Sequence, residues 1–120
     1  MTVAYWIVAA LLALFYLYGG ALKIVRSQEQ LLPMMAWVDT TPMPAVRAIG
    51  AAEVLGAIGL VLPPLTGVAP GLALAAAVGL LVVQVGAIPV HLRRGDRQVA
   101  MNVALLAAAA AAIWLSTTWL

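Results

Sequence analysis

Residues 47–63 read Arg47-Ala-Ile-Gly50-Ala-Ala-Glu53-Val-Leu-Gly56-Ala-Ile-Gly59-Leu60-Val-Leu-Pro63. The segment begins at a cation, is otherwise apolar and stops at a double proline, yet it carries one carboxylate where hydrocarbon is expected. An ionisable side chain left unpaired inside a membrane segment costs several kcal/mol, so it is a functional-site hypothesis by default. The next question is therefore which other polar residues of the chain lie close enough to contact Glu53.

The composition indicates a protein that is solvated by lipid. The chain has 120 residues, of which 66% are hydrophobic and 8% charged, whereas a soluble domain carries about 25% charged residues. No cysteine is present, which excludes disulfides, thiolate metal sites and thiol redox chemistry within this chain. The few basic residues sit beside long apolar runs and do not form a nucleic-acid-binding surface.

Four apolar stretches are long enough to cross a bilayer, which takes ~20 residues. We predict helices over about 3–22, 44–62, 68–90 and 99–119 in a single transmembrane domain, 1–120. The first stretch lacks a positive start and a small-residue cleavage site, so it is a membrane helix and not a signal peptide. Pro63-Pro64 is expected to end the second helix. The predicted fold class is all-α: an antiparallel four-helix bundle integral to the membrane.

The stretch between the first two helices, residues 25–43, is too polar to span. Its prolines exclude a long continuous helix, and its apolar residues predict a short surface segment that lies on the membrane or packs over a helix end.

The charges predict the orientation. Four crossings place both termini on one side, so the two charged loops, 23–47 and 91–98, share the other side. Every lysine and arginine of the chain lies within these two loops. The positive-inside rule makes the charged side cytoplasmic and places both termini outside.

The same topology brings the polar side chains together at the charged end. Glu53 lies six residues beyond Arg47, ~9 Å deeper in a helix. Gln84 lies two turns before His91 and points to the same face, about 10 Å away in depth. The ligand-binding candidates are Lys23, Arg47, Glu53, Gln84, His91 and Asn102. The catalytic candidates are Glu53 and His91.

Two interpretations remain open for the acid and the histidine. Glu53 is either half of a structural ion pair or a carboxyl group that binds a polar substrate or relays a proton. The partners for such an ion pair are Lys23, Arg47 and a protonated His91. His91 is either a helix-end histidine exposed to the cytoplasm or an acid/base partner of Glu53 that titrates near neutral pH.

The remaining candidates also have a structural and a functional interpretation. Lys23 and Arg47 either reach water from helix ends or contribute to the pocket of Glu53. Gln84 and Asn102 form either interhelical hydrogen bonds or ligand contacts. One histidine without a cysteine partner does not indicate a metal, so no metal site is predicted.

Several short motifs of glycine and polar residues are distributed along the chain. They are Gly20-x-x-Lys23, then Arg47-x-x-Gly50-x-x-Glu53-x-x-Gly56-x-x-Gly59-Leu60, Gly86-Ala87, His91 before Arg93-Arg94-Gly95, and Asn102. With these motifs the chain resembles the DoxX-like family of small bacterial membrane proteins, within the wider DoxX/DoxD grouping, over nearly its whole length. The resemblance implies a four-helix protein of the bacterial cytoplasmic membrane. It also implies a polar cluster of Lys23, Arg47, Glu53, His91 and Asn102.

Kinship also bears on function. The grouping takes its name from a subunit associated with a thiosulfate:quinone oxidoreductase, and some relatives are linked to oxidative-stress complexes, so the resemblance implies redox partners and a quinone ligand. We predict an accessory membrane subunit or small-molecule binding module with a polar pocket around Glu53. One alternative is a membrane oxidoreductase or isomerase that uses Glu53 and His91 as an acid/base pair. The other is a structural or transport component that forms homo-oligomers through its Gly and Ala faces.

Overall fold

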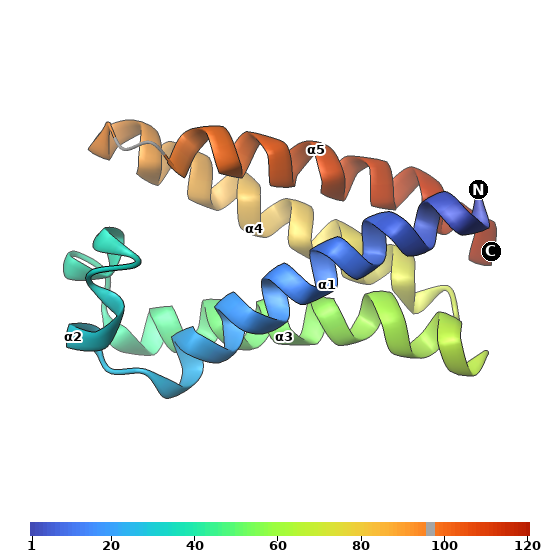
Figure 1. The fold of residues 1–120 in the computed structure, drawn as a ribbon, viewed down its shortest axis with the longest axis horizontal. Helices are drawn as coiled ribbons and strands as arrows, with labels where there is room; N and C mark the ends of the chain where they lie inside the picture. The colour runs from blue at the N-terminus through green and yellow to red at the C-terminus, as the bar shows by residue number, and fades with distance from the viewer. Residues whose placement is uncertain (96–97) are drawn as a thin grey trace.

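Four long antiparallel helices form the body of the protein in the computed structural model, which describes residues 1–95 and 98–120 (Figure 1). They are α1 (Thr2–Val25), α3 (Met43–Thr66), α4 (Leu72–Arg94) and α5 (Gln98–Ser116). The short helices are α2 (Gln28–Leu31), the 3-10 helix η1 (Ala36–Asp39) and the 3-10 helix η2 (Thr117–Trp119). The described residues contain no strand, and the predicted all-α bundle is confirmed.

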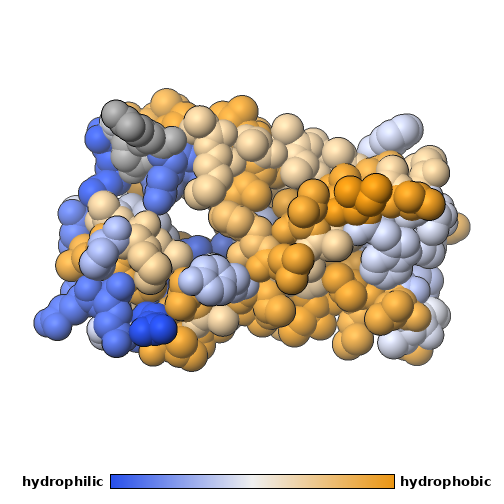
Figure 2. Space-filling model, in the orientation of Figure 1, coloured by the Kyte–Doolittle hydropathy of each residue, from blue (hydrophilic) through white to orange (hydrophobic). Residues whose placement is uncertain are grey.

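The surface of the bundle fits a lipid environment. Each long helix is long and apolar enough to cross a membrane. The longest axis measures 40 Å, and the hydrocarbon core of a bilayer is about 30 Å thick. Figure 2 shows a mostly apolar surface along the bundle and hydrophilic residues gathered at the end that carries α2. The chain is a multi-pass membrane protein.

Both termini lie at one end of the bundle, and the charged segments lie at the other (Figure 1). The guanidinium of Arg94 donates to the carboxylate of Asp39 at 2.9 Å. The amide of Gln98 donates to the carbonyl of Met34 at 3.4 Å. The segment after α1 therefore meets the segment around the α4–α5 turn, as the topology predicts. Asp96 and Arg97, which belong to the predicted loop 91–98, lie outside the described residues.

The surface segment between α1 and α3 is packed over the helix ends. Leu31, Val38 and Val46 are buried together in a small apolar cluster separate from the main core. Ser27 caps α2, because its hydroxyl accepts from the backbone N–H of Gln30 while the Gln30 side chain accepts from the backbone N–H of Ser27. The cluster and the cap give this polar segment a defined position.

α3 continues through Pro63 and Pro64 to Thr66, although the double proline was expected to end it. Pro64 has no N–H, so the carbonyl of Leu60 loses its partner within the helix. The hydroxyl of Tyr5, which is fully buried in α1, donates to that carbonyl at 2.5 Å. A neighbouring helix thus supplies the missing donor, as membrane helices with internal proline require. α3 ends where Gly67 adopts a positive φ of 75°.

The next helix also begins later than predicted. α4 starts at Leu72, four residues after the predicted start at 68. Gly67 and Ala69 both have positive φ, 75° and 48°, which interrupts the helical backbone between α3 and α4.

Replacing Tyr5 by Phe is expected to lower the free energy of unfolding by about 1–2 kcal/mol, because the Leu60 carbonyl is left without a donor in an apolar setting. Pro64→Ala restores a backbone N–H at the position that serves this carbonyl. The loss caused by Tyr5→Phe should therefore shrink in the Pro64→Ala background. Reversible unfolding in mixed micelles gives the free energies of unfolding of the wild type, Tyr5→Phe, Pro64→Ala and the double variant. Equal losses from Tyr5→Phe in the two backgrounds would show that the Tyr5 hydroxyl does not compensate for the missing N–H of Pro64.

Candidate functional site

The site is organised by the crossing of α1 and α3, which pack through two glycines. A Cβ on Gly20 would lie 2.8 Å from the carbonyl oxygen of Gly50, and a Cβ on Gly50 would lie 2.7 Å from that of Gly20. Only glycine permits this approach of the two backbones. The same imagined atoms would lie 3.1 Å from the Cβ of Glu53 and 2.7 Å from the Cβ of Lys23. Each glycine thus faces the charged residue of the other helix.

Lys23 and Glu53 form an ion pair inside the bundle. The Nζ atom of Lys23 lies 2.6 Å from Oε1 of Glu53, and the two side chains are 11% and 3% exposed. Because Cα–Cβ bonds tilt toward the N-terminus of a helix, the Lys23 side chain is directed back along α1 toward Gly19 and away from the charged end. Among the partners that the sequence leaves open for Glu53, the structure selects Lys23.

A cavity of about 550 Å³ lies between these helices and the α4–α5 pair. Its size is within the range of small-molecule sites. Figure 2 shows a hollow in this region with hydrophilic surface inside it. Most of its lining is apolar, and five of the six predicted ligand-binding candidates border it. These five are Lys23, Glu53, Gln84, His91 and Asn102.

Two amide side chains at the cavity have unused hydrogen-bonding atoms. Gln84 and Asn102 are 4% and 5% exposed. The Nε2 atom of Gln84 donates to the hydroxyl of Tyr16 at 2.5 Å. Within the described residues, Oε1 of Gln84 and Nδ2 of Asn102 have no hydrogen-bond partner. A buried polar atom without a partner costs about 1–3 kcal/mol. The wall of the cavity therefore offers an acceptor and a donor to an occupant.

Arg47 has a different position from the other candidates. Its Nη1 atom donates to the backbone carbonyl of Lys23 at 2.8 Å and to that of Arg26. The last carbonyls of a helix lack N–H partners, so Arg47 supplies hydrogen-bond donors to the carbonyls at the C-terminal end of α1. It does not border the cavity as the described residues define it. Arg47 holds the end of the helix that carries Lys23.

His91 faces the interior of the protein. It is 5% exposed and borders the cavity, so it is not a histidine exposed at the helix end. The described residues contain no group of three His, Cys, Asp or Glu side chains that could hold a metal ion.

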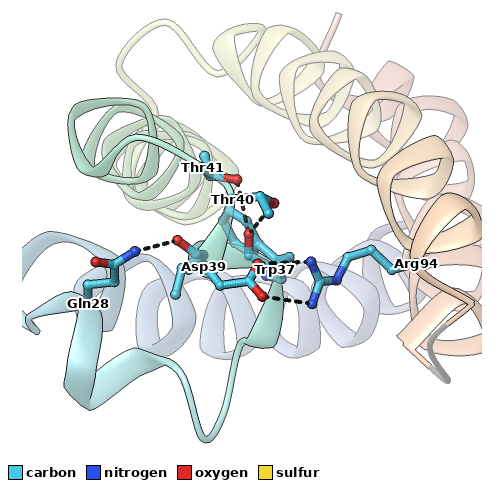
Figure 3. A network of polar contacts seen from close by, with 7 residues as sticks. Gln28, Trp37, Asp39, Thr40, Thr41 and Arg94 are labelled. Carbon is cyan, nitrogen blue, oxygen red and sulfur yellow. Dashed lines mark hydrogen bonds and ion pairs between the residues drawn. The ribbon is translucent and has the colours of Figure 1, made fainter.

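The charged end of the cavity is covered by η1. Trp37 borders the cavity, and its ring centroid lies 5.9 Å from Nζ of Lys23, within reach of a cation–π interaction. The network in Figure 3 positions this cover: Thr41 donates to the Trp37 carbonyl at 3.1 Å, and Asp39 of η1 pairs with Arg94 of α4. Sequence reasoning missed Trp37. The available signal was an aromatic residue within the polar surface segment.

Four membrane helices that enclose a buried ion pair and an amphipathic cavity define a small integral membrane protein with an internal polar site. A family model described as the DoxX-like family matches residues 7–112, most of the chain. The chain belongs to the DoxX-like family, and the resemblance seen in the glycine and charge motifs is confirmed. No curated protein and no solved structure matches it.

Proposed function

We propose that this protein is a membrane-embedded binding module, accessory to a larger membrane assembly, that holds a small lipophilic molecule by its polar end. The observation that carries the proposal is the pair of buried, unpartnered amide atoms of Gln84 and Asn102 at the wall of a 550 Å³ cavity. An apolar pocket with a few convergent polar groups is the usual form of a small-molecule site. Kinship makes a quinone the first candidate, because a quinone carbonyl can accept from Nδ2 of Asn102 and the hydroxyl of its quinol form can also donate to Oε1 of Gln84.

The pairing of Glu53 favours binding over acid/base catalysis. An oxygen of the Glu53 carboxylate already contacts the ammonium of Lys23 at 2.6 Å, so Glu53 could take a proton from a substrate only by giving up this buried ion pair. We assign Glu53 and Lys23 to the electrostatics of the pocket and Gln84 and Asn102 to contacts with the ligand. His91 contributes a further polar group to the same wall.

The proposal includes a location and an orientation. In the bacterial cytoplasmic membrane, the positive-inside rule favours a cytoplasmic position for the end that carries Lys23, Arg47 and Arg94. Both termini then face the outside. Partner subunits, including redox proteins or further copies of this chain, are part of the accessory role.

Fluorescence of Trp37 tests the proposal directly, because quinones quench indole emission at contact. The probe is a benzoquinone with a decyl chain, added to the protein in lipid nanodiscs. The other tryptophans, Trp6, Trp114 and Trp119, are replaced by Phe so that only the cavity residue emits. We expect saturable quenching with one molecule bound. Quenching that never saturates would be collisional and would contradict a binding site.

Asn102→Leu is expected to weaken this binding about tenfold, the effect of losing roughly 1.4 kcal/mol of hydrogen bonding. Ala87→Phe is expected to abolish it by filling the cavity that Ala87 borders. Val85→Phe is the matched control, since Val85 lies in the same turn of α4, is 57% exposed and does not border the cavity. Binding that survives Ala87→Phe, or that is lost equally in Val85→Phe, would overturn the assignment of this cavity.

A further inference from the structure

We propose that the ligand of the cavity is a neutral amphiphile with a single hydrocarbon chain. It enters from the bilayer through a lateral gap between α1 and α5, and its hydrocarbon chain extends through this gap into the lipid. The inference rests on the proposed binding function and specifies the class of ligand and its route. It follows from the shape of the gap, the chemistry of its rim, the cover at the charged end and the charge balance of the site.

The gap arises because α1 and α5 meet at one end and diverge toward the other (Figure 1). At the end of the termini, the ring centroids of Tyr5 and Trp119 are 5.2 Å apart, and those of Trp6 and Trp119 are 5.9 Å apart. Toward the charged end the two helices separate, and the cavity is bordered there by residues of both. The opening thus faces the side of the bundle, which lipid surrounds in a membrane.

The rim of this gap suits a hydrocarbon chain. Phe15 and Tyr18 of α1 border the cavity and are 38% and 69% exposed. Met101 and Leu105 border it from α5, and Met101 is 42% exposed. Phe15 lies eight residues before Lys23, ~12 Å farther from the charged end. An apolar rim at this depth contacts acyl chains, so a ligand chain can pass from the cavity into the bilayer without contacting water.

The charged end is less accessible. η1 covers it with Trp37, and the segment before η1 adds Met34 and Met35 to the lining of the cavity. The ion pair of Asp39 with Arg94 connects this cover to the end of α4. A molecule arriving from water would have to displace the cover, whereas the lipid-facing gap is already open.

The charge balance of the site selects the head group. Lys23 and Glu53 neutralise each other at 2.6 Å. A charged head would therefore add an uncompensated charge at a depth where it is costly. The unpartnered atoms are an acceptor on Gln84 and a donor on Asn102, so the matching head both donates and accepts hydrogen bonds. A hydroxyl group on a glycerol, a quinol or a long-chain alcohol has this chemistry.

Native mass spectrometry of the protein released from nanodiscs tests the class. The discs contain equal mole fractions of a monoacylglycerol, a lysophosphatidic acid and a diacylglycerol. We expect one monoacylglycerol to be retained at least tenfold over the other two, and Ala87→Phe but not Val85→Phe to remove it. Preferential retention of the anionic or the two-chain lipid would overturn this inference while leaving the binding function intact. Retention of none of them, together with absent quinone quenching, would overturn both.

Fluorescence quenching tests where the hydrocarbon chain of the ligand lies. In a protein where Phe15→Trp is combined with replacement of all four native tryptophans by Phe, a monoacylglycerol brominated in its chain should quench the indole at the rim. The matched control keeps Trp114 alone, since that residue is 65% exposed at the far end of α5. At low mole fraction of the brominated lipid, we expect at least fivefold stronger quenching at the rim. Equal quenching at both positions would overturn the proposed path.

Discussion

Glu53→Gln is expected to lower the free energy of unfolding by about 3–5 kcal/mol, the largest effect of any substitution considered for this protein, because it leaves the buried ammonium of Lys23 without a counter-charge. The double variant Lys23→Met with Glu53→Met should recover most of this loss, since two apolar side chains of similar length remove both desolvated charges. Reversible unfolding in mixed micelles gives the free energies of unfolding of the wild type, of Glu53→Gln and of the double variant.

Asp39→Asn provides the control for this cycle. Its carboxylate pairs with Arg94 at 2.9 Å, but the Asp39 side chain is 47% exposed, so its loss should cost less than about 1 kcal/mol. If Glu53→Gln costs no more than Asp39→Asn, the ion pair of Lys23 does not stabilise the bundle. If the double variant is as unstable as the single one, the loss has a cause other than an unpaired charge.

Gly50→Ala is expected to destabilise the protein by about 2–3 kcal/mol through overpacking at the helix crossing. The added methyl group would lie 2.7 Å from both the Gly20 carbonyl oxygen and the Cβ of Lys23. Backbone atoms cannot move aside as a flexible side chain can, so α1 must shift away from α3. That shift also disturbs the contact between Lys23 and Glu53.

The same substitution at Gly79 of α4 should have the opposite sign. A Cβ at Gly79 would meet no atom within 4 Å, and alanine is favoured over glycine in a helix by about 1 kcal/mol. The two variants are compared by unfolding in the same micelles. A stabilising Gly50→Ala, or equal effects at the two positions, would show that the crossing does not depend on glycine.

The membrane bundle was predictable because its signals are local. Long apolar runs separated by charged or proline-containing segments define four spans, and the distribution of lysine and arginine places Lys23 and Arg94 at the same end. The extent of α3 was not predictable in this way. The proline rule applies to Pro64, but the donor that compensates for it is Tyr5, far away in the sequence and brought close by packing.

The sequence indicates which residues lie near the cavity better than it indicates which partners they contact. The count of turns from the charged end places Glu53 and Gln84 at similar depth, and the structure has both at one cavity. The partner of Glu53 could not be derived, because it depends on the register in which Gly20 and Gly50 cross. Arg47 is near Glu53 in sequence, yet its guanidinium contacts the end of α1. Trp37 was missed because a short 3-10 helix has no periodic pattern.

The contacts between the helices differ at the two ends of the bundle. Three aromatic rings, those of Tyr5, Trp6 and Trp119, pack edge to face at the end of the termini, while the partly exposed ion pair of Asp39 and Arg94 connects the helix pairs at the other end. We therefore expect any change in the volume of the cavity to move the end that carries η1 more than the end of the termini. If the proposed ligand binds, a label attached near η1 is expected to respond to it, whereas a reporter domain fused to either terminus is not.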